Sequence, residues 1–452
     1  MWFYIVLAIA KLSSIAINLI DSSRGTDFPG KLALFLDKKF ASKFKQVDFQ
    51  KTIIVTGSNG KSTTTNLLYH IFTENGVKAA SNLKGSNMLN GVATVFVKNT
   101  SLSGKPKADV FILEVDERSL PDVLASYPAE HVVVTNVMQD QVHRNGEPDL
   151  VYSIFKNSFN KSMVMYLNND EPRSKSYESL GRETVYYGVE QNPASYVKDK
   201  PLDVTMPCPF CRHKIVFSFM NVSNMGRFEC SHCGFKSEES SVSVKQANFD
   251  EGTFVIGSTE FSMPYTAPVM LYNYAASAAV AMRFGLSEPS IAKAVSSFVN
   301  VSGRMESLKY KDKTLNYIRM KQENPETLQG ALDAIAQDKT EKVFVIGLCT
   351  LDERRPHWVP HYANTYYAYE CDFKPLLASG VEKVIAFSEY VCYDIANRLL
   401  YDGADPDKLV VINSDEPKDV MKAIGESKSS TVYFITLMRV MDGFKAYIAQ
   451  SA

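Results

Sequence analysis

The stretch from Val55 to Thr64, Val-Thr-Gly-Ser-Asn-Gly-Lys-Ser-Thr-Thr, constrains the fold and the chemistry of this chain more than any other. Residues 51–55 form a short apolar, β-branched run typical of a buried parallel strand, and residues 63–72 have the spacing of an amphipathic helix. A glycine-rich turn between a strand and a helix lets the backbone wrap an anion, and the helix N-terminus adds free N–H groups and partial positive charge. The sequence therefore predicts a phosphate-binding loop.

Two side chains of this loop have expected roles. Lys61 would reach the β- and γ-phosphates of a nucleotide, and the Ser62 hydroxyl would ligate Mg²⁺. The spacing Gly57-x-x-Gly60-Lys61-Ser62 is shorter than the general phosphate-loop pattern and meets only its second half. The alternative is a glycine-rich turn that opens an ordinary helix. The order of strand, turn, lysine, hydroxyl and helix favours nucleotide binding, with these further candidate residues: Gly57, Asn59, Gly60 and Thr63.

The apolar run 108–117 predicts a strand that ends in three acids within four residues. In an open α/β sheet, ligands bind at the carboxyl ends of the strands, so a carboxylate there can hold Mg²⁺ against the phosphates. Glu114 is the first candidate. The alternative is a solvated acidic turn.

Strands and helices alternate along the rest of the chain. Strands are expected at 132–137 and 163–167 with a helix at 149–161 between them, which predicts a doubly wound parallel α/β sheet. An alanine-rich helix begins at 272, and beyond 306 the alternation restarts as a smaller α/β domain. The expected divisions are a lead-in, 1–45, a nucleotide-binding domain, 46–305, and a C-terminal domain, 306–452.

Four cysteines form two close pairs in a C-x₂-C-x₁₈-C-x₂-C arrangement: Cys208, Cys211, Cys230 and Cys233. Each pair can supply two sulfurs to one tetrahedral Zn²⁺, and such a closed shell leaves no position for substrate. The spacing predicts a structural zinc ribbon inserted at about 200–240. One alternative is a redox disulfide, which would need only one of the two Cys-x-x-Cys pairs. The other is four unrelated thiols, which would require both pairs to occur by coincidence.

The composition is that of an ordinary globular chain, with 45% hydrophobic and 22% charged residues and a formal net charge of -1 over 452 residues. There is no basic excess to indicate nucleic-acid binding. Seven cysteines without a cleavable signal pattern favour a reducing cytoplasm. Residues 1–20 are almost continuously apolar, but Lys11 lies at their middle, where a charge in a bilayer costs on the order of 3 kcal/mol. A buried or interfacial helix is favoured over a membrane-surface helix or a membrane span.

With these motifs in place, the chain resembles the Mur ligase superfamily and, within it, the MurT family of synthetase subunits. The zinc ribbon inside such a domain is the most discriminating feature. The other segments that carry the resemblance are 30–31, 56–64, 87–91, 113–117, 135–147, 167–172, 272–273, 304–306 and 324–325.

The resemblance implies a reaction. Mur ligases use ATP to activate a carboxylate as an acyl phosphate, which an amine then attacks. Asn273 and Arg304 would contact the nucleotide, and Glu114 would be a second Mg²⁺ contact beside Ser62. Lys156 falls where several Mur ligases carry a carbamylated lysine that holds another Mg²⁺; the alternative is a solvated helix lysine.

In the MurT family the acid that is amidated is the α-carboxyl of D-glutamate in the stem peptide of lipid II. No UDP-binding domain precedes the loop, as expected for a lipid-linked substrate. Ammonia comes from a GatD-like glutaminase subunit that docks on the C-terminal domain, and the enzyme works in the cytoplasm or at the inner face of the membrane. Two other hypotheses remain. The chain is a diverged paralogue with another substrate or without glutaminase coupling, or it is an unrelated phosphate-loop ATPase or scaffold.

Two segments depart from the family pattern. Residues 139–147 lose an arginine and an aspartate, and His143 is either a substitute ligand or a surface residue, the latter being favoured. In the C-terminal domain, residues 350–358 replace an aspartate-rich stretch that includes a proposed member of the partner's catalytic triad. Asp352 is either that aspartate, displaced by an insertion, or the function is lost.

Overall fold

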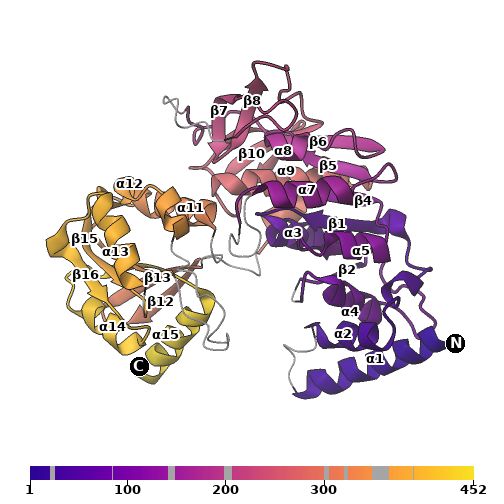
Figure 1. Ribbon diagram of the computed structural model, residues 1–452, viewed down its shortest axis with the longest axis horizontal. Helices are drawn as coiled ribbons and strands as arrows, with labels where there is room; N and C mark the ends of the chain where they lie inside the picture. Colours follow the sequence, from indigo (N-terminus) through magenta and orange to yellow (C-terminus); the bar gives the residue numbers. More distant parts are fainter. Residues whose placement is uncertain are drawn as a thin grey trace. The chain divides into compact units, whose positions relative to one another are not determined.

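The computed structural model describes residues 1–20, 26–83, 85–140, 148–197, 206–299, 305–319, 324–348, 366–389 and 391–451. The chain divides into two compact units (Figure 1). Unit 1 comprises Met1–Met138 and Pro148–Val301, and unit 2 comprises Gln139–Glu147 and Ser302–Ala452.

Unit 1 is built on a nine-stranded sheet of order β11-β10-β9-β6-β5-β4-β1-β3-β2. The strands from β2 to β9 in this order are parallel, and β10 pairs antiparallel with both of its neighbours, β9 and β11. The strand bounds are β1 (Thr52–Thr56), β2 (Ala79–Ser81), β3 (Val110–Glu114), β4 (His131–Val134), β5 (Val164–Asn168), β6 (Glu183–Val189), β9 (Val242–Asn248), β10 (Thr253–Ile256) and β11 (Thr259–Ser262). The predicted doubly wound α/β sheet is confirmed, with β1 at the point where the chain switches from one side to the other.

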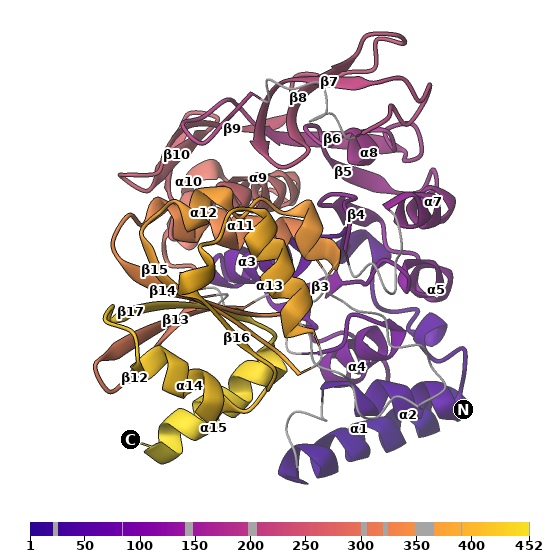
Figure 2. The ribbon, with the colours of Figure 1, turned by 60° about the vertical axis from the view of Figure 1, so that its left-hand side comes forward.

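Helices cover both faces of this sheet, and a buried apolar cluster lies under each set (Figure 2). One set comprises α3 (Lys61–Glu74), α9 (Pro268–Arg283) and α10 (Glu288–Ser296). The other comprises α1 (Trp2–Ile20), α2 (Phe28–Leu36), α4 (Leu89–Asn99), α5 (Leu120–Ser126) and α7 (Pro148–Ser158). Short helical turns are α8 (Pro172–Lys175), η2 (Ala41–Lys43) and η3 (Phe49–Lys51).

The apolar N-terminal segment forms α1, which packs along one face on α2 and α4. Val6, Leu7 and Ala10 are fully buried on that face. The Lys11 ammonium donates to the carbonyl oxygens of Val97 and Thr100, which have no helical partner at the end of α4. Within the described residues, no helix combines the length and apolar character that crossing a bilayer requires.

The connection from β6 to β9 holds the cysteine motif. Its hairpin, β7 (Ile215–Val222) and β8 (Met225–Cys230), pairs antiparallel as a separate two-stranded sheet. The Gly226 N–H donates to the Asp170 carbonyl oxygen (2.9 Å), and the Asn221 amide donates to the Val189 carbonyl oxygen (2.9 Å). These bonds attach the hairpin to the ends of β5 and β6.

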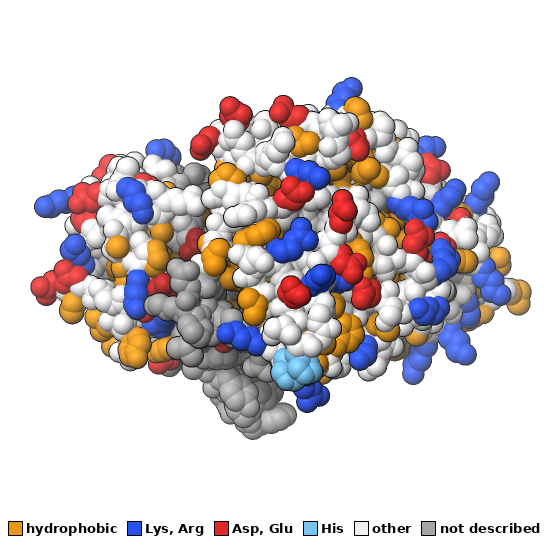
Figure 3. All heavy atoms as spheres, turned by 90° about the horizontal axis from the view of Figure 1, so that it is seen from above, with side chains coloured by type: hydrophobic (Ala, Val, Ile, Leu, Met, Phe, Trp, Pro, Cys, Tyr) orange, Lys and Arg blue, Asp and Glu red, His pale blue; other side chains and the backbone are white. Residues whose placement is uncertain are grey.

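Unit 2 is a six-stranded sheet of order β12-β13-β17-β14-β15-β16, parallel except for the β12–β13 pair. Apolar clusters fill both of its faces. Its elements are β12 (Met305–Tyr310), β13 (Lys313–Arg319), α11 (Pro325–Gln337), β14 (Lys342–Gly347), η5 (Tyr366–Glu370), α12 (Lys374–Leu377), β15 (Val381–Phe387), α13 (Cys392–Tyr401), η6 (Pro406–Lys408), β16 (Leu409–Ile412), α14 (Pro417–Gly425), β17 (Thr431–Thr436) and α15 (Met438–Ser451). The expected smaller α/β domain is therefore present. On the face drawn in Figure 3, both acidic and basic side chains are exposed.

Candidate nucleotide and metal sites

The predicted phosphate loop joins β1 to α3, as its sequence requires. Gly57 and Gly60 have φ angles of +127° and +84°, which side chains with a Cβ rarely adopt. A Cβ on Gly57 would lie 2.1 Å from the Thr135 hydroxyl oxygen, and one on Gly60 would lie 2.6 Å from Asn273 Oδ1. The loop is therefore a close backbone cradle that only glycine permits.

Lys61 begins α3 and is 6% exposed. Its ammonium donates to the carbonyl oxygens of Gly57 and Ser58, the latter at 3.0 Å, and forms an ion pair with a Glu117 carboxylate oxygen. The side chain thus curls back over the loop. The Lys61 ammonium is thereby held beside the cradle, where its positive charge would stabilise a bound phosphate.

The segment after β4 braces the loop. The Ser58 hydroxyl donates to the Met138 carbonyl oxygen and accepts from the Met138 N–H, both at 2.9 Å. The Asn136 side chain accepts from the Asn59 N–H at 2.9 Å and donates to the Asn59 carbonyl oxygen at 3.1 Å. Four hydrogen bonds between two loops that follow neighbouring strands preorganise the cradle before any ligand arrives.

Glu114 ends β3 at the same edge of the sheet as the loop, because β3 pairs in parallel with β1 and places Glu114 opposite Val55. Its carboxylate accepts from the Asn87 amide at 3.1 Å. Asn82 holds the backbone of Glu114 through both its N–H and its carbonyl oxygen, at 2.9 and 2.8 Å. The half-buried carboxylate is therefore oriented at the carboxyl end of the sheet, as expected.

Glu117 is the residue that sequence reasoning did not single out. It is 1% exposed; one carboxylate oxygen meets Lys61, and the other, Oε2, is buried without a hydrogen-bond partner among the described residues. A buried, unsatisfied carboxylate oxygen is costly unless a cation or donor arrives. The signal was present in the acidic run after β3, but the sequence did not say which of its acids turns toward the lysine.

Asn273 lies in α9, more than two hundred residues after the loop, and is 6% exposed. Its Oδ1 accepts from the Thr64 hydroxyl at 3.2 Å and sits beside Gly60. The fold therefore brings Asn273 to the loop, where the resemblance expected it. Ser62 is exposed at the start of α3, and the neighbouring Thr63 is buried.

The group of oxygens suits a hard divalent cation. Mg²⁺ prefers carboxylate, hydroxyl and phosphate oxygens. Here Glu114 is the last residue of β3, and Glu117, with its unsatisfied Oε2, follows in the segment just after the strand. Ser62 adds an exposed hydroxyl in the first turn of α3.

The remaining predicted site residues are Arg304, Asp352, His143 and Lys156. Arg304 and Asp352 lie outside the described residues, as do His143 and the rest of 141–147. Lys156 is exposed in the last turn of α7, where its charge complements the helix C-terminus. Its carbamylation stays a prediction.

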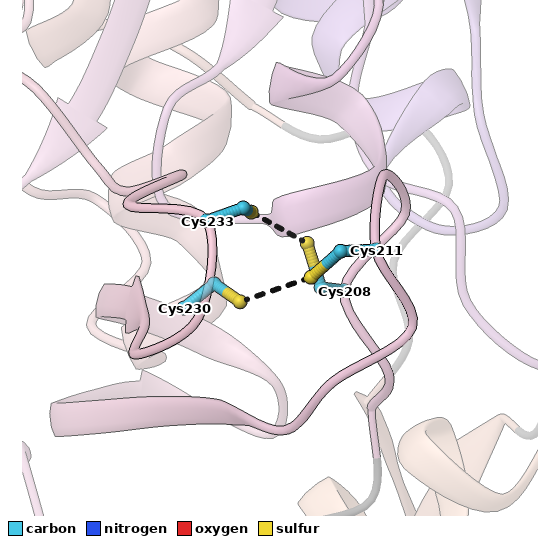
Figure 4. A group of neighbouring side chains, drawn as sticks. All are labelled: Cys208, Cys211, Cys230 and Cys233. Atoms are coloured by element: carbon cyan, nitrogen blue, oxygen red, sulfur yellow. Dashed lines mark hydrogen bonds between the residues drawn. The ribbon is translucent and has the colours of Figure 1, made fainter.

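The four cysteines converge as their spacing predicted (Figure 4). Their sulfurs lie within 4.8 Å of one another, with Cys208 to Cys233 at 3.6 Å and Cys211 to Cys230 at 3.4 Å. Those separations are far too long for a disulfide and close to the roughly 3.8 Å edge of a tetrahedron with Zn–S bonds of about 2.3 Å. The cluster can hold one metal ion with no open position.

The backbone of each cysteine pair has the same turn. The N–H four residues after the first cysteine donates to that cysteine's carbonyl oxygen, from Arg212 to Cys208 at 2.9 Å and from Gly234 to Cys230 at 3.0 Å. Both donors have positive φ, +64° and +74°. Backbone N–H groups of Cys233 and His232 lower the pKa of Cys230 to about 6, which favours the thiolate that a metal needs.

The base of the hairpin carries a buried acid. Asp170 follows β5, and its carboxylate accepts from the Val189 N–H at 2.8 Å. Burial raises the pKa of Asp170 to about 6, and the hydrogen bond from Val189 offsets only part of that shift.

Comparison with known proteins assigns this fold and site to a class. Residues 55–231 match the Mur ligase middle domain family. A pseudomurein peptide ligase type C from Methanothermus fervidus has a similar structure, with a TM-score of 0.68 and 19% identity over 91% of this chain and 80% of that chain. MurF from Acinetobacter baumannii has a TM-score of 0.61 and 14% identity over 93% of this chain and 80% of that chain. The chain belongs to the Mur ligase superfamily.

The C-terminal part narrows this assignment, because residues 322–438 match the MurT ligase C-terminal family. Two relatives carry the name lipid II isoglutaminyl synthase (glutamine-hydrolyzing) subunit MurT. The one from Staphylococcus aureus (strain COL) is 28% identical over 83% of each chain. The one from Streptococcus pneumoniae (strain ATCC BAA-255 / R6) is 26% identical over 94% of this chain and 93% of its own. Within the Mur ligase superfamily, the chain is thus of the MurT type.

Proposed function

We propose that this protein is the synthetase subunit of a lipid II isoglutaminyl synthase, which amidates the α-carboxyl of D-glutamate in the lipid II stem peptide with ATP. One observation carries the proposal: Lys61 turns back over the glycine cradle and pairs with Glu117, and Glu114 ends the neighbouring strand β3 at the same edge of the sheet. This arrangement lies in a chain whose C-terminal part is of the MurT type. The names of the relatives supply the substrate and the reaction.

The chemistry explains why a phosphate site is needed. Ammonia cannot displace hydroxide from a carboxylate. A carboxylate oxygen therefore attacks the γ-phosphorus of ATP and ADP leaves, which forms an acyl phosphate. The ammonia nitrogen then attacks the acyl carbon, inorganic phosphate leaves with the C–O bond electrons, and the nitrogen loses a proton to give the amide.

The chain's own residues would act mainly through charge and position. The cradle N–H groups and Lys61 would hold the phosphates and offset charge on the transferring phosphoryl group. Ser62, Glu114 and Glu117 would hold Mg²⁺, which would supply positive charge against the negative charge of the phosphates. Asn273, fixed beside Gly60, would contact the nucleotide, and Arg304 is proposed for the same role.

The cysteine cluster would hold Zn²⁺ as a structural ion. The ammonia would come from a GatD-like glutaminase subunit, with Asp352 proposed as a member of the partner's triad. Since lipid II is membrane-linked, the complex would work at the inner face of the cytoplasmic membrane.

A second candidate is a diverged MurT-type ligase with another carboxylate substrate or without a glutaminase. It is favoured by residues 139–147, which lack an arginine and an aspartate of the family pattern.

The test is ADP release by the purified chain with lipid II, ammonia and Mg²⁺, with and without a glutaminase subunit, and mass spectrometry of the product. We expect lipid II and ammonia each to be required, and the product to carry an amide in place of one carboxyl. Protein that binds ATP yet shows no stimulation by lipid II and ammonia would exclude the first candidate. Stimulation by a different carboxylate would support the second.

A further inference from the structure

The outer face of α1 is apolar along its length. Its large exposed side chains recur at helical spacing on the side opposite the buried face, and their exposed fractions are Trp2 52%, Tyr4 49%, Ile5 44%, Ile9 38%, Leu12 67% and Ile15 63%. Ala8 and Ala16 lie between them. A surface helix of a globular protein normally carries polar residues on its outer face. A continuous apolar stripe in this place marks a contact surface.

The inner face of α1 is already occupied. Val6, Leu7, Ala10 and Ser14 are buried against unit 1, and the Phe3 ring meets Phe40 and Phe44 with ring centroids 5.4 and 5.1 Å away. The hydrogen bonds of Lys11 fix the rotation of the helix about its axis. In Figure 2, α1 runs along the edge of unit 1 with α2 and α4 on its inner side. The apolar outer stripe is therefore held outward by the fold.

The N-terminal segment that contains the stripe is rich in basic residues. The first 51 residues contain seven lysines and one arginine against four aspartates and no glutamate, although the whole chain has a net charge of -1. Lys31, Lys38, Lys39 and Lys45 are exposed, and α2 adds Phe35 with 83% exposure.

We propose that α1 lies flat on an anionic bilayer surface, with its outer stripe among the acyl chains and the surrounding lysines at the lipid headgroups. A helix with one apolar face and flanking cations inserts in this way to a depth of about 5–10 Å. Trp2 and Tyr4 are of the types enriched at membrane interfaces. A second copy of the chain fits this face less well, because pairing two stripes would bring two lysine-rich surrounds together.

This attachment goes beyond the ligase reaction and is tested without it, by sedimentation of the full chain with vesicles that contain no lipid II. Vesicles of phosphatidylglycerol are compared with vesicles of phosphatidylcholine, at low and high salt. We expect binding to the anionic vesicles, weakened at least about tenfold by high salt or by neutral lipid. Equal binding to both lipids, or no binding, overturns the proposal.

Variants assign the binding to the stripe. Ile9→Gln with Leu12→Gln should reduce binding about tenfold or more, whereas Leu150→Gln with Leu400→Gln, two exposed leucines elsewhere, should not. Lys38→Glu with Lys39→Glu should weaken binding to anionic vesicles only. Wild-type binding by the stripe variant contradicts the proposal. A second contradicting result is a wild-type protein that does not bind vesicles but forms a stable dimer by light scattering, while the stripe variant is a monomer. The stripe would then join two copies of the chain.

Amidation of a water-soluble stem-peptide substrate is measured in parallel. Loss of vesicle binding with intact amidation overturns only the membrane attachment. Vesicle binding without amidation supports the attachment and counts against the proposed function alone.

Discussion

Lys61 of the phosphate loop and Glu117 beyond β3 form a buried ion pair, with side chains 7% and 1% exposed. The lysine is thereby held over the loop, and the second oxygen of Glu117 is left for another cation or donor. In the proposed phosphoryl transfer, Lys61 would supply a fixed positive charge at the phosphates and Glu117 a carboxylate for the metal.

Lys61→Ala should abolish turnover, with a loss of at least about 100-fold, because the charge on the transferring phosphoryl group is no longer offset. It should also destabilise the fold by about 3–5 kcal/mol, since Glu117 is left as an unpaired buried charge. Adding Glu117→Gln should recover much of that stability without recovering activity. Thermal unfolding and ADP release measure the two effects, and unaltered turnover in Lys61→Ala would refute the phosphate-loop assignment.

Glu117→Gln alone should weaken Mg²⁺-dependent ATP binding and lower kcat, because a neutral amide is a poorer ligand for a hard cation. Titration calorimetry with ATP, in the presence and absence of Mg²⁺, separates this from a general loss of binding. Asp122→Asn, an exposed acid in α5, is the matched control. If ATP affinity falls equally with and without Mg²⁺, Glu117 is not a metal ligand.

Gly60→Ala should prevent ATP binding, because the new Cβ would displace Asn273 Oδ1, 2.6 Å away. Gly76→Ala is its control: Gly76 has a similar φ, +77° against +84°, but a Cβ there meets nothing within 4 Å. Both changes should cost about 1–2 kcal/mol through backbone strain, and only Gly60→Ala should affect ATP binding. Binding by both variants would show that Asn273 and the cradle are not the nucleotide site.

Asp170 should make stability depend on pH. The pKa of Asp170 is about 6 in the folded protein against an ordinary value of 3.8 for aspartate, so the folded state holds the proton more tightly. Stability from this group is therefore present below about pH 4 and is lost as pH rises to about 6, by about 2–3 kcal/mol in total. Asp170→Asn should flatten the profile of Tm against pH between 4 and 7, while exposed Asp250→Asn should leave it as in the wild type.

Metal removal should act on the ribbon and not directly on the nucleotide loop. We expect one zinc per chain by elemental analysis, and loss of that zinc in Cys230→Ser. Hydrogen exchange should then accelerate in β7 and β8 while β1 stays protected, because β1 is an interior strand of the nine-stranded sheet, between β4 and β3. Rapid loss of ATP binding in a chain that stays folded would contradict a purely structural metal.

The sequence predicted the elements whose signals are local. The strand expected at 163–167 is β5 (Val164–Asn168), which differs by one residue at each end, and the two cysteine pairs converge as their spacing predicted. It did not predict the strands β9 to β11, which are short and alternate between buried and exposed residues without a strong apolar run. The ion pair of Lys61 was also missed, because its partner is 56 residues away and only the pairing of β1 with β3 brings the two together.

The placement of the ribbon between β6 and β9 has an evolutionary consequence. Two adjacent parallel strands need a crossover, usually a helix packed on the sheet, whereas the described residues between these strands, 190–197 and 206–241, contain none. The four sulfurs, with the metal proposed for them, would order this crossover in place of a helix that packs an apolar stripe on the sheet. A module held in that way owes little to the sheet's core, so homologues can lengthen, shorten or rewrite it freely as long as both cysteine turns survive.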